Sequence, residues 1–326
     1  MEIIRDFQEL TKYPSPVVTI GNFDGVHLGH QKIFRRVVEK AREINGTPMA
    51  ITFEPHPVRA LAPEKGLRML TAFEDKVNLI SLMGLKVLIC IRFDREFART
   101  EPDMFIKTFL VKKLGTKWVI VGHSYAFGKG KKGTTALLRR RGSKFGLHVS
   151  VVRYAKVYED IVSSSRIRSL LLRGRVCEAS RMLGRLYYIE GTVIRGAGRG
   201  ASLLHTPTAN IMSASELIPK EGVYAVKVSF NHYGVLSASH FLPGQVYDGV
   251  ANIGKNPTFG DAKLNYEVHI FDLDKDLLGM KMRMHFADRL RDEKKFQTIY
   301  ELEQQIQRDK EKTRQILSRR NDPLYL

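Results

Sequence analysis

The first half of the chain alternates short apolar runs with longer segments in which apolar residues recur every three or four positions. The apolar runs predict buried strands at 16–21, 48–55, 86–94 and 117–122. The periodic segments predict helices at 30–44, 73–84 and 102–115. Alternating strands and helices are typical of a doubly wound α/β domain with a parallel sheet, in which ligands bind at the carboxyl ends of the strands.

The pattern changes near Arg185, where short runs rich in β-branched and aromatic residues replace the helical segments. Glycine and turn residues separate these runs, which predict strands at 187–196, 222–230, 247–254, 264–273 and 280–290. Helical periodicity returns only at 293–317. Short strands followed by one helix predict a compact β-barrel with a C-terminal helix. Because a helical stretch at 165–184 precedes the change, we predict two domains, residues 1–185 and 186–326.

Length and composition agree with this division and narrow the class of protein. The 326 residues suffice for about two domains, and 43% of them are hydrophobic. The two cysteines, Cys90 and Cys177, lie far apart in apolar or helical stretches and form neither a disulfide framework nor a metal-spaced cluster. The chain has no run of about 18 apolar residues, and its charged N-terminus lacks a signal-peptide pattern. We therefore expect a cytoplasmic enzyme without a membrane partner.

The net charge of +19 favours anionic partners such as nucleotides, phosphorylated metabolites or nucleic acid. A basic, solvated surface explains the charge equally well. The basic residues cluster at FGKGKKG and LLRRRGSK, without an RNA-binding signature of interleaved aromatic residues. We expect small anionic substrates and do not expect nucleic acid as a partner, and the sequence leaves the oligomeric state open.

The segment TIGNFDGVHLGHQ connects the first predicted strand to the first predicted helix. Gly21 and Gly25 allow a sharp turn and a close approach of the backbone to a ligand. The free N–H groups and the dipole at a helix start favour a phosphate. His27 and His30, separated by Gly29, can then donate to a phosphorus centre that gathers negative charge in a transition state. This suits attack of a substrate phosphate on the α-phosphorus of ATP with release of pyrophosphate, although a packing or metal-binding histidine pair stays open.

The stretch GNFDGVHLGHQ resembles the G-x-F-D-G-x-H-x-G-H signature of the bacterial bifunctional riboflavin kinase/FAD synthetase family, within the wider cytidylyltransferase-like superfamily. FEPHP and VSSSRIR are similar to that family's flavin-site loop and its I-S-S-T-x-I-R motif. The resemblance implies a Rossmann-like domain that adenylylates FMN to FAD with ATP, using His27 and His30. It assigns ATP and phosphate binding to Gly21, Phe23, Asp24, Gly25, Gly29, Ser163, Ser164, Ser165 and Arg168. It assigns the flavin site to Phe53, Pro55, His56, Pro57 and Phe127. Taken alone, the serine run also fits an ordinary helix cap.

The second half carries kinase motifs in the order of the same family. TPTANI, VYDGVANIGKNPTFG and YEVHIFDLDKDLLG resemble its P-T-A-N, N-x-G-x-N-P-T and E-x-H-x-x-D-F-x-x-D-L-Y-G segments. The resemblance implies a six-stranded antiparallel barrel that phosphorylates riboflavin to FMN with ATP and Mg²⁺. It makes Glu267 the base and Thr208 and Asn210 the Mg²⁺ ligands, although the strand pattern alone also fits a solvent-facing Glu267. It assigns the ATP site to Gly196, Gly198, Gly200, Pro207, Thr208 and Asn210.

Two departures from the family pattern leave alternatives open. VGHSYAFG has Ser124 and Tyr125 where the family usually has an acid and a phenylalanine. ASLLHTPTAN lacks the glycine and phenylalanine that usually precede P-T-A-N, and residues 204–206 stand nearby. We predict a bifunctional enzyme of flavin cofactor synthesis. The alternatives are a chain that keeps one activity, foremost the adenylyltransferase, a nucleotidyltransferase for another phosphate-bearing acceptor, and a basic nucleic-acid-binding relative.

Overall fold

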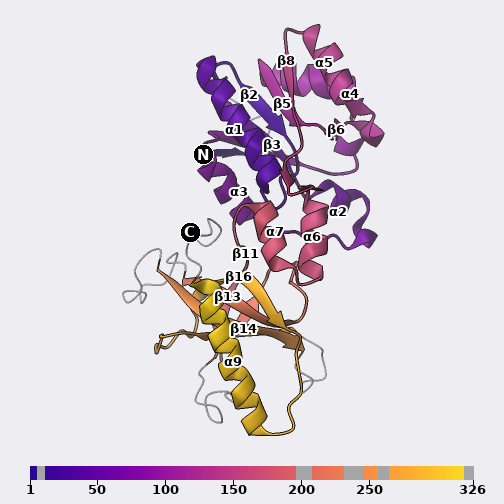
Figure 1. The fold of residues 1–326 in the computed structure, drawn as a ribbon. Helices are drawn as coiled ribbons and strands as arrows, with labels where there is room; N and C mark the ends of the chain where they lie inside the picture. Colours follow the sequence, from indigo (N-terminus) through magenta and orange to yellow (C-terminus); the bar gives the residue numbers. More distant parts are fainter. Residues whose placement is uncertain (6–11, 196–207, 231–244, 256–263, 319–326) are drawn as a thin grey trace. The chain divides into compact units, whose positions relative to one another are not determined.

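The computed structural model describes residues 1–5, 12–195, 208–230, 245–255 and 264–318 of the chain. The chain divides into two compact units, Met1–Ser164 and Ser165–Leu326 (Figure 1). In the described parts, no helix is long and apolar enough to cross a membrane.

The first unit is built on a six-stranded sheet in the order β1-β4-β3-β2-β5-β8, and its strand pairs are parallel. The strands are β1 Glu2–Ile4, β2 Val17–Ile20, β3 Pro48–Glu54, β4 Val87–Arg92, β5 Trp118–Gly122 and β8 His148–Val152. From β2 the chain adds β3 and β4 on one side of the sheet, and it then adds β5 and β8 on the other side. The topological switch point, where ligands bind in such sheets, therefore lies between β2 and β5. The doubly wound prediction is confirmed.

Helices bury apolar residues against both faces of this sheet. The helices of the first unit are α1 Leu28–Glu43, α2 Pro57–Leu61, α3 Phe73–Leu82, α4 Pro102–Met104, the π-helical η4 Phe105–Lys113 and α5 Thr135–Ser143, and α2 has no buried residue. On one face, Phe34 and Val37 of α1 and Ile80 of α3 form a core with the strands. On the other face, Phe105 and Leu138 join a second core with η4 and α5.

Short elements complete the first unit. They are the 3-10 helices η2 Pro63–Lys65, η3 Phe97–Arg99 and η5 Lys129–Lys131, and the strands β6 Ala126–Phe127, β7 Gly133–Thr134, β9 Lys156–Val157 and β10 Asp160–Ile161.

The second unit contains a closed barrel in the order β11-β12-β15-β14-β13-β16, with antiparallel neighbours. Its strands are β11 Tyr187–Ile194, β12 Ala209–Ser213, β13 Gly222–Phe230, β14 Val246–Lys255, β15 Leu264–Ile270 and β16 Lys281–Arg291. Its helices are α6 Ser164–Leu172, α7 Val176–Leu183 and α9 Ile299–Leu317. Leu317 of α9 packs on Ala225 and Ala287, so the terminal helix covers β13 and β16 (Figure 1). The predicted six-stranded barrel with its terminal helix is confirmed.

Some local predictions differ from the structure, and β1, β8 and α5 were not among the predicted elements. The last helix begins at Ile299 because the Thr298 side chain caps it, accepting from the N–H of Glu301 at 3.2 Å. The stretch 165–184 forms two helices because the chain turns at Gly174, whose φ is +77°. The helix predicted at 102–115 is α-helical only at its start and then winds as a π-helix. Strand β12 was absent from the strand prediction because its alternation of apolar and polar residues covers only Ala209 to Ile211 and breaks at Met212.

Candidate active sites

The loop between β2 and α1 is shaped by close packing. Phe23 is 1% exposed, and a Cβ added at Gly21 would lie 2.8 Å from its ring, so only glycine fits there. Gly25 has a φ of +82°, in the left-handed region that glycine tolerates. The buried Asp24 carboxylate accepts from the N–H of Leu70 at 3.0 and 3.2 Å. Asp24 therefore anchors this loop from below, and its predicted part in ATP binding stays a prediction.

The two histidines lie together at the start of α1. His27 is the N-cap residue, and its Nδ1 accepts from the backbone N–H of His30 at 3.4 Å. Their rings stack with centroids 3.6 Å apart and planes inclined by 16°. A Cβ at Gly29 would lie 3.1 Å from the His27 ring, so the small residue between the histidines leaves room for the stack. The structure thus brings the predicted pair together at the carboxyl end of β2.

The protonation of this pair follows from its surroundings. Burial, and secondarily the neighbouring His27, holds the pKa of His30 well below 6.5, so its imidazole is neutral at pH 7. Because Nδ1 of His27 accepts a hydrogen bond, a neutral His27 carries its proton on Nε2. Nδ1 of His30 is buried and has no hydrogen-bond partner in the described structure. The pair can therefore offer N–H donors to an anionic group without being charged beforehand.

The flavin-site residues expected from FEPHP lie at the carboxyl end of β3. Phe53 packs edge-on against Phe93, with ring centroids 5.5 Å apart, and tilted against Phe97, at 6.0 Å. The Glu54–Pro55 peptide bond is cis. His56 caps α2, since its Nδ1 accepts from the N–H of Val58 at 3.1 Å, and Pro57 is the first residue of that helix.

Phe127 follows β5 and is buried, with Tyr125 stacked on it at 5.4 Å and 13°. Carboxyl ends of parallel strands share one edge of a sheet, so the residues after β2, β3 and β5 gather at the same edge. The Tyr125 hydroxyl is buried with no hydrogen-bond partner in the described parts, and burial raises its pKa far above 10. This residue, which departs from the family pattern, therefore contributes its ring rather than its hydroxyl to the packing.

The serine and arginine motif divides between the units. Ser164, the last residue of the first unit, donates its hydroxyl to the carbonyl oxygen of Asp24 at 3.0 Å. Ser163 precedes α6, while Ser165 and Arg168 lie on α6 in the second unit. Phosphate binding by these residues stays a prediction.

The kinase candidates meet on one face of the barrel through strand register. Glu267 on β15 lies opposite Asn210 of β12 on one side and opposite Asn252 of β14 on the other. Directly opposite residues point to the same face of a sheet, so the three side chains form a row. Glu267 also accepts from Asn265 Nδ2 at 2.7 Å, which holds the carboxylate in place. Thr208 is exposed just before β12.

Asn252 was missed as a single residue, although the N-x-G segment that contains it was recognised. Its Nδ2 donates to Glu293 at 2.9 Å, and its Oδ1 is buried with no partner in the described structure. The predicted Gly196, Gly198, Gly200 and Pro207 lie outside the described residues.

Comparisons with known proteins cover both halves of the chain. A family model described as FAD synthetase matches residues 11–166, and one described as riboflavin kinase matches residues 183–317. The chain is 33% identical to the bifunctional riboflavin kinase/FMN adenylyltransferase of Escherichia coli K12, over 95% of this chain and 96% of that protein. It is 36% identical to the protein of that name from Bacillus subtilis, with 90% of each covered. A crystal structure named as a macrolide-efflux protein from Streptococcus pneumoniae has a TM-score of 0.85 and 30% identity, over 96% of this chain and 98% of that one.

Proposed function

The chain belongs to the family of bifunctional riboflavin kinases/FMN adenylyltransferases, and from this premise we propose which residues perform its two reactions. The enzyme phosphorylates riboflavin to FMN and adenylylates FMN to FAD. Both reactions use ATP and Mg²⁺ in this proposal, and the enzyme acts in the cytoplasm.

For adenylylation, the stacked histidine pair at the start of α1 carries the proposal. A phosphate oxygen of FMN attacks the α-phosphorus of ATP, the bond between the α-phosphorus and the bridging oxygen breaks, and pyrophosphate leaves with the electron pair. Negative charge grows on the α-phosphate oxygens, and His27 and His30 donate N–H groups to them. The N-terminal N–H groups of α1 add a positive electrostatic field there.

The other adenylyltransferase assignments complete this site. Ser163, Ser164, Ser165 and Arg168 hold the leaving phosphates, and Arg168 acts as a charged clamp. Phe53, Pro55, His56, Pro57 and Phe127 contact the flavin. Support comes from the gathering of the loops after β2, β3 and β5 at one sheet edge.

For the kinase reaction, the row of Asn210 and Glu267 carries the proposal. Glu267 accepts the proton of the ribityl hydroxyl while the hydroxyl oxygen forms its bond to the γ-phosphorus of ATP, and ADP leaves. Gly196, Gly198, Gly200 and Pro207 are assigned to ATP by resemblance alone.

The donor set near Glu267 fits Mg²⁺. Asn210 shares a face with Glu267, and Thr208 stands two residues before Asn210, just before β12. They offer a hydroxyl and an amide oxygen, and Mg²⁺ takes a few such oxygens while phosphates and water fill its other positions. In the part of the chain that the structure describes, no group of three or more His, Cys, Asp or Glu could hold a metal by itself. The metal neutralises phosphate charge when bound, and Thr208 and Asn210 would orient it.

We keep residues 1–185 and 186–326 as the proposed domains. The compact units divide at 164/165, and the matched families end at 166 and begin at 183. The segment between them includes α7, whose Val176, Ala179 and Leu183 are buried. Fragments 186–326 and 165–326 test the boundary: folding of both by circular dichroism supports 185/186, whereas folding of only the longer fragment moves the boundary to 164/165. Two free cysteines are compatible with the cytoplasmic location.

A chromatographic time course with riboflavin, ATP and Mg²⁺ tests the whole assignment. FMN should appear first and FAD should follow, and both should cease when Mg²⁺ is chelated. FAD formation from added FMN, without any FMN from riboflavin, would instead support the single-activity alternative that the altered residues 204–206 suggest.

A further inference from the structure

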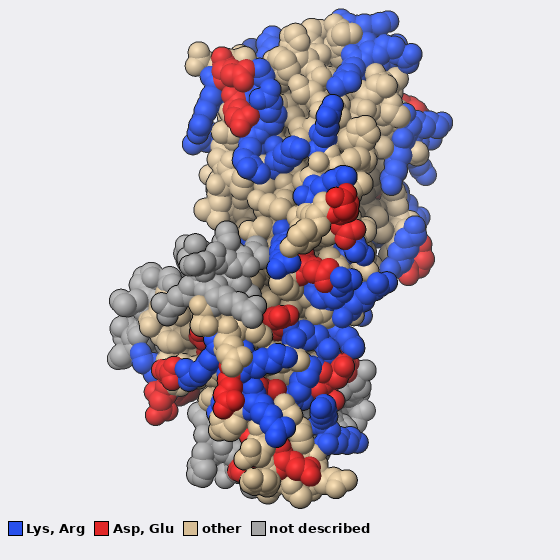
Figure 2. Space-filling view, in the orientation of Figure 1, with Lys and Arg blue, Asp and Glu red and all other residues tan. Residues whose placement is uncertain are grey.

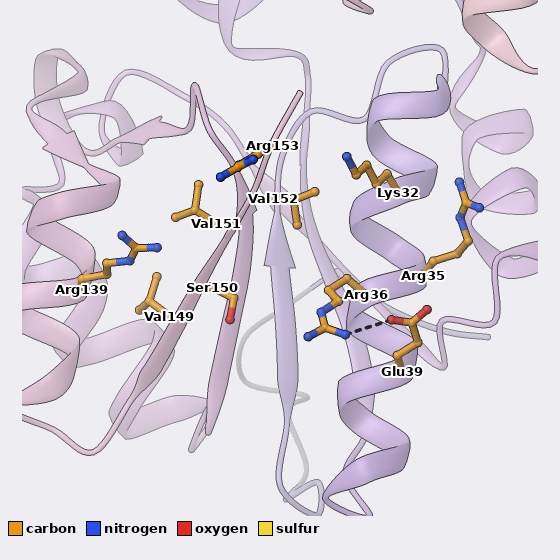
Figure 3. Close-up of a pocket in the computed structure, with 10 residues that line it drawn as sticks. All are labelled: Lys32, Arg35, Arg36, Glu39, Arg139, Val149, Ser150, Val151, Val152 and Arg153. Carbon is orange, nitrogen blue, oxygen red and sulfur yellow. Dashed lines mark hydrogen bonds and ion pairs between the residues drawn. The ribbon is translucent and has the colours of Figure 1, made fainter. Parts of the chain in front are cut away.

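A basic cavity of 770 Å³ lies in the first unit between α1, α5 and β8 (Figure 3). Its lining contains none of the residues assigned above to either reaction. Five lining residues are basic and one is acidic, a net charge of +4: they are Lys32, Arg35, Arg36, Arg139, Arg153 and Glu39. Glu39 pairs with Arg36 at 3.2 Å. Lys32, Arg35, Arg139 and Arg153 have no ion-pair partner in the described residues. The positive charge of the cavity therefore favours an anionic ligand.

The cavity includes the edge of a sheet. β8 is the last strand in the sheet order, so within the described structure only β5 pairs with it. His148 donates to Lys117 and the carbonyl of Val152 accepts from His123, so alternate residues of β8 bond toward β5. Because bonding direction alternates along a strand, Val149 and Val151 direct their N–H and C=O groups to the open edge. These groups can pair with another extended backbone.

Cations stand on both sides of this edge. In Figure 3, Lys32 and Arg36 of α1 lie on one side of β8, Arg139 of α5 lies on the other, and Arg153 lies at the strand's end. Successive side chains of a strand point to opposite faces. A strand added beside β8 would therefore place alternate side chains toward the α1 cations and toward Arg139.

We propose that β8 binds an extended acidic peptide segment of a partner protein as an added strand, with the segment's carboxylates on the cations of α1 and α5. Main-chain hydrogen bonds to Val149 and Val151 provide the pairing, and charge provides the selectivity. A second copy of the chain is a poor occupant, since two cavities of +4 would repel each other. Single-stranded nucleic acid is disfavoured because the lining has no aromatic side chain on which a base could stack.

The expected complex is transient and sensitive to salt. β8 has five residues, so few main-chain bonds can form, and the cations are exposed to solvent. Lys and Arg residues gather widely on the visible face of the molecule, so the test must separate this cavity from the general basic surface (Figure 2).

The test uses the full-length protein and a fluorescein-labelled peptide of about eight residues that repeats Glu-Glu-Thr-Thr, so that both faces of the added strand carry carboxylates, a length that spans one strand. Fluorescence polarisation should show binding at about 50 mM salt and at least a tenfold weaker affinity at about 200 mM. The double variant Lys32→Glu/Arg139→Glu should weaken binding at least tenfold. The matched control Arg42→Glu/Arg140→Glu changes exposed residues of the same two helices outside the cavity and should change binding less than threefold, about the effect expected of a distant surface charge.

Amide hydrogen exchange tests the strand pairing separately. The peptide should protect the amides of Val149 and Val151, and a peptide N-methylated at every residue, which has no N–H group on either edge, should not bind. Equal weakening by both double variants would reduce the effect to general surface charge and overturn the proposal. Tighter, cavity-dependent binding of a single-stranded oligonucleotide of matched charge would assign the cavity to nucleic acid. Failure to bind either probe at low salt would overturn the proposal and indicate that the cations serve only to prevent edge-to-edge pairing of β8 with other strands.

Discussion

Replacement of His30 by alanine tests the chemistry of the adenylyltransferase site most directly. His30 stacks on His27 at 3.6 Å and packs edge-on against Phe23 at 5.3 Å. The substitution removes one donor to the transition state and the support of the second. Loss of one such donor lowers kcat by about 10²–10³-fold, or roughly 3–4 kcal/mol. The loss of packing should lower stability by only about 1–2 kcal/mol, so the domain should remain folded.

The assay follows FAD formation from FMN and ATP, while the same sample converts riboflavin to FMN as an internal control. His30→Ala should lower the first rate by about 10³-fold and leave the second unchanged. A matched Arg42→Ala variant, exposed on the same helix, should have both rates unchanged. FAD synthesis within tenfold of the wild-type rate in His30→Ala would refute the donor role.

The pH dependence checks the same reasoning independently. Because the pKa of His30 lies well below 6.5, the residue is neutral throughout the interval from pH 6.5 to 8. The wild-type kcat/KM for FAD formation should therefore show no step from His30 in that interval. A step near pH 6.5 that disappears in His30→Ala would show that burial does not lower this pKa as the stacked geometry requires.

Three further predictions concern other residues. Glu267→Gln should lower FMN formation by about 10²–10⁴-fold while FAD formation from added FMN continues, and normal riboflavin phosphorylation would remove Glu267 as the base. Tyr125→Phe deletes a buried hydroxyl that has no partner in the described structure, and should stabilise the first domain by about 1 kcal/mol, seen as a rise in melting temperature of roughly 2–4 °C. A lower melting temperature would indicate that the hydroxyl is satisfied. Burial, and secondarily the nearby Arg283, lowers the pKa of His285 to about 4. Between pH 6.5 and 4 the unfolded chain therefore binds a proton that the folded barrel does not bind. The free energy of unfolding of the barrel should fall by about 3 kcal/mol as the pH is lowered through that interval. Amide exchange of β13 and β16 should show this fall in the wild type but not in His285→Gln, and equal pH dependence in both would contradict it.

The first site could be predicted closely because its parts are consecutive in the sequence. A strand, a glycine turn and a helix start lie within one short segment, so the spacing of His27 and His30 nearly determines their placement at the start of α1. The buried position of Asp24 could not be predicted, because its partner Leu70 lies far along the chain. The ring stack of Tyr125 on Phe127 was also unpredicted, since the packing of side chains depends on both faces of the folded sheet.

The second site depends on strand register, which local patterns do not encode. Asn210, Asn252 and Glu267 come from three strands, and they form a row only because β15 pairs with β12 and β14 in one particular register. A shift of one residue would turn Glu267 to the opposite face and separate it from both asparagines. Buried Val268 and Tyr266 resist that shift, because it would bring Glu267 into the barrel interior and move their apolar side chains out. The apolar residues of β15 therefore fix the position of the carboxylate as firmly as the polar residues beside it.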